Sequence, residues 1–203
     1  MQLSIERYWR DISDLSAMIP LDAVTAAAEL LLDCYRQERT VFMLGNGGSA
    51  ATASHFACDL AKGTRVAGTP TFRVMALTDN VPLLTAWAND TTYDRVFAEQ
   101  LAALVRPSDL VIAISASGGS PNVLRAVAEA RRLGATTLAL TGRTGGDLAG
   151  MVDLAVRVPA DRIELVEDAH IVIAHSLCVA LREQLCQELA ACAGDDQPVL
   201  DVA

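Results

Sequence analysis

The stretch Asp109-Leu110-Val111-Ile112-Ala113-Ile114-Ser115-Ala116-Ser117-Gly118-Gly119-Ser120-Pro121 decides the fold, because it joins a long apolar run to a serine- and glycine-rich loop. The run is continuous in apolar, mostly branched residues, which is typical of a parallel strand buried on both faces. Pro121 falls in the first turn of the next predicted helix, where its missing N–H costs little. Hydroxyl and backbone N–H groups therefore converge where a strand leads into a helix, and such a place favours a phosphate group.

Ser115, Ser117 and Ser120 are placed to donate hydrogen bonds to phosphate oxygens. Serine and glycine also occur in ordinary turns, and Ser117 or Ser120 could serve only to cap the following helix. The loop thus predicts a phosphorylated small molecule as the ligand, with a purely structural turn as the alternative.

Similar apolar runs alternate with helical patterns along the middle of the chain. Strands are predicted at 41–45, 72–78, 110–115, 136–141 and 153–158, and helices at 49–62, 93–105 and 120–133, with a short one near 145–150. This βαβ rhythm predicts an α/β fold: a three-layer αβα sandwich with a five-stranded parallel sheet, whose ligands bind beyond the carboxyl ends of the strands.

The two ends of the chain differ from this core. Two amphipathic helices are predicted at 3–16 and 21–38, and a long one without Gly or Pro at 162–192. We expect one domain over 1–193, made of N-terminal helices (1–38), an α/β core (39–160) and a C-terminal helix (161–193), followed by a loose tail at 194–203. Helices outside a compact sheet must bury their apolar stripes, and another copy of the chain is the simplest partner.

The composition excludes several classes of protein. The 203 residues are 52% hydrophobic and carry a formal charge of −9, and a nucleic-acid groove would need clustered Lys and Arg instead. No apolar run is long enough for a membrane span, and the first residues do not resemble a signal peptide. The five cysteines are odd in number and form no C-x-x-C pair. We therefore expect a reduced, cytoplasmic protein that binds neither nucleic acid nor membrane.

A second glycine loop, Gly45-Asn46-Gly47-Gly48-Ser49, follows the first predicted strand. Glycines permit close approach of the backbone to a ligand, and Ser49 can cap the next helix. The loop breaks the G-x-G-x-x-G spacing, and the chain contains no G-x-x-x-x-G-K-[ST] motif. We therefore expect no nucleotide cofactor.

The three histidines all lie beside carboxylates in two helical stretches. His55 and Asp59 stand four residues apart, and Glu167, His170 and His175 fall near the start of the long helix. Such groups can bind a divalent metal or transfer protons, although single helical His–acid pairs are often only structural. Spacing alone favours Glu167 with His170, one turn apart, because Glu167 and His175 are separated by about 12 Å of helical rise.

Taken in order, these motifs resemble a known family. Gly45-Asn46-Gly47-Gly48-Ser49 with His55, Asn89-Asp90, the Ser115–Val123 loop, Leu140-Thr141-Gly142 and Asp161-Arg162-Ile163 are similar to the sugar isomerase (SIS) domain. Within it they are most similar to the sedoheptulose-7-phosphate (phosphoheptose) isomerases, from about residue 5 to 190. The resemblance implies a flavodoxin-like SIS fold and a homotetramer whose active sites combine residues from neighbouring subunits.

The resemblance also implies a role for each matching residue. Asp59 is the proton-transferring carboxylate, with His175 as its partner, so the resemblance favours His175 over His170. Zn²⁺, which some members bind, would be held by His55, Asp59, Glu167 and His175. Substrate-binding positions are Asn46, Gly47, Gly48, Ser49, Asn89, Asp90, Ser115, Ala116, Ser117, Ser120 and Glu167.

Three positions depart from the family pattern. Asp59 stands where Glu is frequent, Glu167 where Gln is frequent, and Ala116 where Thr is usual. A set of two histidines and two carboxylates should hold a divalent cation more firmly than one with a neutral amide. Because Ala116 lacks a hydroxyl, the phosphate loop should depend more on backbone N–H groups.

The activity that the resemblance implies is isomerisation of sedoheptulose 7-phosphate to a manno-heptose 7-phosphate, by proton transfer between C1 and C2 through an enediol. Two non-catalytic alternatives are a tetrameric adaptor that binds the bacterial replication initiator, and a sugar-phosphate sensor. An enzyme needs the acid and base groups at His55, Asp59 and His175, whereas a sensor needs only the serine loop.

Overall fold

The computed structural model describes residues 1–193, so the predicted loose tail at 194–203 lies outside the described residues. Five strands form one parallel sheet in the order β2-β1-β3-β4-β5. They are β1 (Thr40–Gly45), β2 (Arg73–Ala76), β3 (Leu110–Ser115), β4 (Thr136–Thr141) and β5 (Leu154–Arg157). This is the strand order of flavodoxin-like proteins, and it confirms the predicted α/β fold class.

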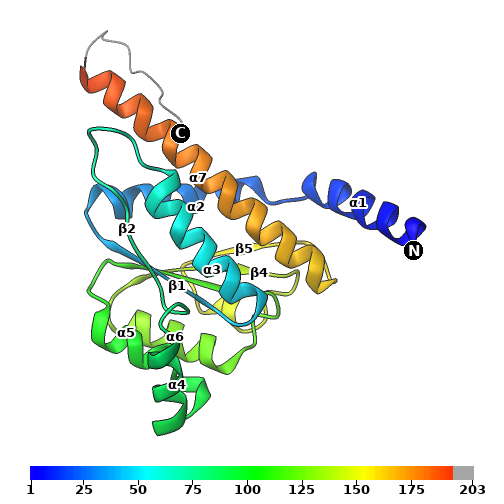
Figure 1. Cartoon of the computed structure of the whole chain (residues 1–203), viewed down its shortest axis with the longest axis horizontal. Helices are drawn as coiled ribbons and strands as arrows, with labels where there is room; N and C mark the ends of the chain where they lie inside the picture. The colour runs from blue at the N-terminus through cyan, green and yellow to red at the C-terminus, as the bar shows by residue number, and fades with distance from the viewer. Residues whose placement is uncertain (194–203) are drawn as a thin grey trace.

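The helices cover both faces of the sheet (Figure 1). They are α1 (Gln2–Ser16), α2 (Leu21–Arg36), α3 (Gly48–Cys58), α4 (Val81–Asp90), α5 (Ala98–Leu104), α6 (Pro121–Arg132) and α7 (Ile163–Ala193). On one face, alternate strand residues such as Met43 and Ile112 pack with α2, α3 and α7. On the other, Leu44 and Ala113 pack with α5 and α6. The two-residue period of the strands thus divides the apolar side chains into two cores, one on each face.

The pairing of β1 with β3 positions both predicted ligand loops. In this parallel pair Gly45 stands opposite Ile114, so the two strands end side by side. The chain leaves β1 toward β2 on one side and returns to form β3 on the other, which makes this edge a topological switch point. Ligands of open α/β sheets bind at such points. The Asn46 loop and the Ser115–Ser120 loop therefore lie next to each other.

Two predicted helices differ from those observed. The helix predicted at 49–62 ends at Cys58 and continues as a π-helical turn, Asp59–Gly63. The one predicted at 93–105 consists of a 3₁₀ turn, Tyr93–Arg95, and the separate helix α5. Val96 and Phe97, buried between these two pieces, explain why the segment is apolar without forming one continuous helix.

Helix α4 was not predicted from the sequence. The Asn80 side chain accepts a hydrogen bond from the Leu83 N–H at its start, and no residue of α4 is buried. Because α4 has no buried face, its apolar residues do not repeat with helical spacing. In the sequence, only the capping residue Asn80 and Pro82 indicate that a helix begins here.

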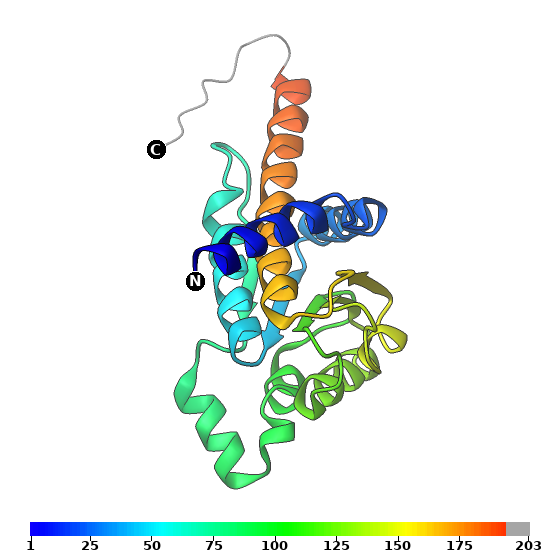
Figure 2. The same ribbon diagram turned by 90° about the vertical axis from the view of Figure 1, so that its right-hand side faces the viewer.

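Helix α1 lies across α7 and extends beyond the sheet (Figure 2). Leu15 is its only buried residue, while Leu3 and Trp9 are 77% and 69% exposed. A groove of about 500 Å³ separates α1 and α2 from α7, lined by Tyr8, Ile12 and Ile171 among others. In residues 1–193 no single helix is long and apolar enough to cross a membrane; α1 and α2 pass that test only as a pair bent by 71°.

Candidate functional site

The two ligand loops are joined by a reciprocal pair of amides. Asn46 Nδ2 donates to Asn122 Oδ1 and Asn122 Nδ2 donates to Asn46 Oδ1, both at 2.8 Å. The Tyr93 hydroxyl also donates to Asn46 Oδ1, at 3.2 Å. Asn122 is 2% exposed, and it was not predicted as a site residue. Its position directly after Pro121, in the first turn of α6, is the only local signal that could have suggested one.

The serine loop keeps its hydroxyl protons available for a ligand. The Ser115 and Ser117 Oγ atoms accept hydrogen bonds from the backbone N–H groups of Gly118 and Gly119, at 3.2 and 3.3 Å. A hydroxyl that accepts in this way can still donate its own proton. Ser120 occupies the N-cap position of α6, yet within the described chain its side chain makes no capping hydrogen bond. The structure therefore does not use Ser120 as a side-chain cap.

Gly118 is required where the loop meets its neighbour. Its φ is +64°, and a Cβ at this position would lie 2.0 Å from the carbonyl oxygen of Gly145. Beside this contact lies a hollow of about 400 Å³, lined by Ala116, Ser117 and Thr144 among others. Arg143 and Asp161 also line it, paired through Nε and Oδ1 at 2.8 Å. The hollow thus holds hydroxyl-bearing residues and an ion pair, in which the Arg143 charge is balanced by a carboxylate.

The predicted sugar-contacting residues lie around the start of α3. Gly47 is the N-cap residue, and Ser49 is buried in the first turn. A Cβ on Gly48 would lie 2.5 Å from Glu167 Oε1, so a larger residue here would require the Glu167 carboxylate to move. The pair Asn89 and Asp90, whose side chains hydrogen-bond at 2.9 Å, ends α4 just before the turn that carries Tyr93.

His55, Asp59 and His175 form one cluster, because α3 packs beside α7 (Figure 1). The two imidazole Nε2 atoms are 2.8 Å apart, and Asp59 Oδ2 lies 3.2 Å from that of His55 and 3.4 Å from that of His175. Both imidazoles are about half exposed. At 2.8 Å one nitrogen donates and the other accepts, so the pair holds a proton between them. The cluster can therefore exchange protons with a ligand, or bind a cation.

Glu167 opens into the same hollow as the two histidines but does not join their cluster. The hollow measures about 420 Å³ and is lined by Gly48, Thr52, His55, Glu167 and His175 among others. The three mutually close ligand atoms belong to His55, Asp59 and His175, and the Glu167 carboxylate lies against Gly48 instead. The structure thus brings together three of the four predicted metal ligands and places the fourth outside their cluster, in the lining of the same hollow.

His170 faces away from this hollow, so the pairing of Glu167 with His170 that helical spacing favours does not form. His170 is 0% exposed, and its Nε2 lies 3.2 Å from the carbonyl oxygen of Thr141 at the end of β4. Burial lowers its pKa from 6.5 to about 4. His170 is therefore a neutral imidazole that ties α7 to the sheet.

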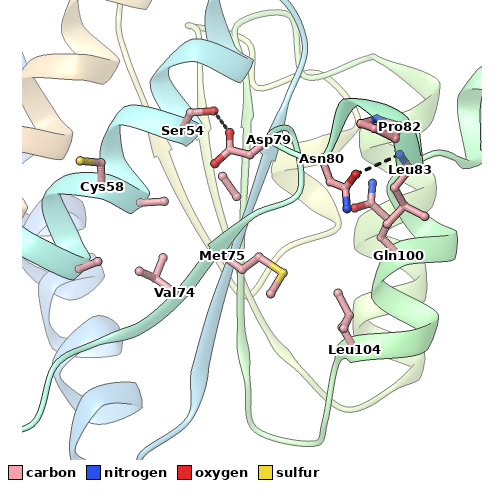
Figure 3. Close-up of a pocket in the computed structure, with 13 residues that line it drawn as sticks. Ser54, Cys58, Val74, Met75, Asp79, Asn80, Pro82, Leu83, Gln100 and Leu104 are labelled. Atoms are coloured by element: carbon pink, nitrogen blue, oxygen red, sulfur yellow. Dashed lines mark hydrogen bonds between the residues drawn. The ribbon is translucent and has the colours of Figure 1, made fainter. Parts of the chain in front are cut away.

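A larger hollow of about 810 Å³ lies beside β2 (Figure 3). Its walls are mostly apolar, with Val74, Met75 and Leu104 among them. Of its polar residues, Ser54 donates a hydrogen bond to Asp79, and Asn80 accepts one from the Leu83 N–H. Ser54 and His55 leave α3 on different sides, so none of the clustered acid and base groups lines this hollow. It holds none of the predicted site residues.

Comparison with known proteins gives consistent matches over most of the chain. The family model described as the SIS domain matches residues 7–142. A phosphoheptose isomerase of Mycobacterium tuberculosis is 44% identical over 163 residues, which cover 80% of this chain and 83% of that protein. Two solved structures of phosphoheptose isomerases each cover 90% of this chain. That from Neisseria gonorrhoeae has a TM-score of 0.84 at 33% identity and is covered to 98%, and that from Francisella tularensis has 0.85 at 32% and is covered to 99%.

The burial of His170 predicts a specific loss of stability in acid. Between pH 6.5 and about 4 the unfolded chain binds one more proton at this residue than the folded chain. The free energy of unfolding should therefore fall as the pH falls, by up to about 1.4 kcal/mol per pH unit. His170→Gln keeps a donor for the Thr141 carbonyl and does not titrate, so urea unfolding across this range should show a smaller slope. An identical slope in both proteins would contradict the assignment.

Proposed function

Because this chain belongs to the SIS domain family, and within it to the phosphoheptose isomerases, we propose that it is an aldose–ketose isomerase acting on sedoheptulose 7-phosphate. The observation that carries the proposal is the cluster of Asp59 with His55 and His175, within 3.4 Å of one another. A sensor or an adaptor needs no such set of proton-transfer groups at its ligand site. The relatives named as isomerases likewise do not favour the two non-catalytic alternatives.

The serine loop is the proposed phosphate site. Ser115 and Ser117 have hydroxyl protons to donate, and Ser120 stands at the start of α6 with its side chain unused as a cap. Because Pro121 has no N–H and the Val123 N–H already bonds to Asn122 Oδ1 at 3.0 Å, the serine hydroxyls are the main donors at this place. Ala116 contributes its backbone rather than a hydroxyl. The Asn46–Asn122 pair keeps this loop and the Asn46-Gly47-Gly48 loop together, so one phosphorylated sugar can contact both.

Asp59 is the proposed base. It removes the proton from C1 of the ketose while the carbonyl oxygen at C2 is protonated, which gives a C1–C2 enediol. Return of the proton to C2 and loss of the proton from the C1 hydroxyl produce the aldose. His175 is the proposed acid, because its Nε2 shares a proton with His55 and can supply it to the oxygen. In each of the two steps the sugar therefore loses one proton and gains one.

A divalent ion fits the three clustered ligands. Adjacent ligands of a tetrahedral zinc site with bonds of about 2.1 Å lie about 3.4 Å apart. The two distances to Asp59 match this value, and the 2.8 Å between the imidazoles needs only a small opening. We propose Zn²⁺ at this place, held by His55, Asp59 and His175, with Glu167 in the same hollow as the further ligand. When bound, the ion would occupy the place of the proton between the imidazoles and would itself stabilise negative charge on the substrate oxygens. His175 would therefore act as the acid only in the metal-free protein, while Asp59 would keep its second carboxylate oxygen for the proton.

Assembly completes the proposal. In one chain the serine loop and the histidine cluster open into separate hollows, on either side of the start of α7. Their separation supports a site to which neighbouring subunits contribute, and the exposed apolar face of α1 offers them a contact surface. We propose a homotetramer. We also propose the cytoplasm as its location, because Cys34, Cys58, Cys178 and Cys186 are free thiols.

Turnover of heptose phosphates tests the function. Purified protein should interconvert sedoheptulose 7-phosphate and the aldose form, followed by NMR. Asp59→Asn should lower kcat by roughly 10²- to 10⁴-fold, since an amide cannot accept the proton. Ser117→Ala should instead weaken substrate binding by about 1 to 3 kcal/mol. Asp22→Asn, on the exposed part of α2, is the matched control and should behave as wild type. Full activity in Asp59→Asn would exclude Asp59 as the base.

Metal analysis tests the ion separately. We expect up to one zinc per subunit, and a chelator should lower turnover. Glu167→Gln should weaken zinc binding by about tenfold, because it removes a negative charge from the same hollow. Glu164→Gln, an exposed carboxylate on the same helix, should leave the affinity unchanged. Protein that holds no metal and turns over equally well with chelator would limit the site to metal-free proton transfer.

Light scattering tests the assembly. The mass should be four times the 21.5 kDa of one chain. Trp9→Asp should shift the mass downward, because it places a charge on the apolar face of α1 beside the groove. Arg10→Gln, also on α1, should leave the mass unchanged. A monomer at micromolar concentration in the unaltered protein would contradict a shared active site.

A further inference from the structure

The hydrogen-bond register of the backbone changes at Asp59. Its N–H still bonds to the carbonyl of His55, four residues earlier, as in an α-helix. Its own carbonyl, however, accepts from the N–H of Thr64, five residues later, at 3.2 Å. Asp59 therefore begins a π-helical turn, a rare feature that is frequent at functional sites. The residue proposed as the base is thus the one at which the helix widens.

Thr64 closes this turn from the inside. It is 2% exposed, and besides its backbone bond its Oγ1 donates to the carbonyl of Leu60 at 2.6 Å. Leu60 is itself fully buried in the core. From α7, Arg182 Nη1 lies 3.4 Å from the carbonyl oxygen of Gly63. The turn is therefore held at its far end by a buried threonine and by a contact with the helix that carries His175.

The same turn lies against the side chain of Asp59. A Cβ at Gly63 would stand 3.8 Å from the Asp59 Cβ, with no other heavy atom within 4 Å. An aspartate side chain has only two rotatable bonds, so the place of its carboxylate follows its backbone closely. With the backbone in this position, the carboxylate reaches the imidazoles at 3.2 and 3.4 Å.

We propose that Thr64 is a positioning residue, which closes the π-helical turn and so sets the Asp59 carboxylate against His55 and His175. Thr64 acts through Asp59 and does not touch the sugar. The effect on turnover rests on the proposed function, whereas the effect on the geometry of the cluster does not.

Three variants test this role. Thr64→Val keeps the shape of the side chain but removes the donor to Leu60, and kcat should fall roughly tenfold to a hundredfold with KM within about twofold. Thr64→Ser keeps the hydroxyl and should restore most of kcat. Thr69→Val removes a comparable side-chain bond, from Thr69 Oγ1 to the Val66 carbonyl at 2.9 Å, and should behave as wild type.

The side-chain spectra of the three histidines give a readout that needs no activity. In long-range ¹H–¹⁵N spectra, Thr64→Val should shift the His55 and His175 resonances and leave His170, which lies away from the cluster, unchanged. Thr64→Ala, which removes the hydroxyl and leaves space instead of a second methyl group, should shift the same two and decides the matter if Thr64→Val does not fold. A wild-type protein without turnover would overturn the proposed function alone, since these spectra still report on Asp59.

The inference is overturned by either of two results. One is a folded Thr64→Val protein with wild-type kcat and unchanged His55 and His175 resonances. The other is a loss of kcat that Thr64→Ser does not restore, because a variant that keeps the hydroxyl would then fail as well and the hydrogen bond to Leu60 could not account for the loss.

Discussion

The parallel pairing of β1 with β3 is the constraint on which the ligand site depends. Because parallel strands run in the same direction, both must release their chains at one edge of the sheet, and the register that sets Gly45 opposite Ile114 makes them end together. The loop with Asn46 and the loop with Ser115 are then neighbours although 69 residues separate them. The Asn46–Asn122 amide pair fixes that proximity with two hydrogen bonds of 2.8 Å. A shift of register would separate these loops and remove from the buried Asn122 amide its partner on Asn46.

A second contact, between α3 and α7, brings the acid and base groups together. Both helices cover the same face of the sheet, so residues 120 positions apart meet at 2.8 Å. Within α7, His170 and His175 lie on different faces of the helix and therefore have different surroundings. His175 turns to the hollow, whereas His170 turns to the sheet and stays neutral because it is buried. One helix thus supplies both a titratable group for the site and an uncharged anchor for the core.

Local donors are what would let an acidic chain hold the proposed phosphate. The net charge of −9 would repel a phosphate at long range, but Ser117, Thr144 and Arg143, the last paired with Asp161, line one hollow, and the Ser115 and Ser117 hydroxyls keep protons to donate. Their effect is short-ranged and depends on orientation. The carboxylates of Asp59 and Glu167 lie instead with the two histidines, where a cation or a proton would be attracted. The proposed phosphate site and the histidine cluster are therefore kept in separate hollows.

Elements whose signals are local could be predicted from the amino-acid sequence. Apolar runs alternating with helical patterns predicted all five strands, and Pro121 after the serine loop predicted the start of α6, because an apolar run and the missing N–H of proline are visible within a few residues. The tertiary structure decided what depends on packing between distant segments. It selected His175 rather than His170 for the cluster, since helical spacing cannot say which face meets α3. It also separated Glu167 from the other three ligands and gave Asn122 its partner. Finally, it widened the helix at Asp59, because that turn is closed by a threonine whose burial only the folded core provides.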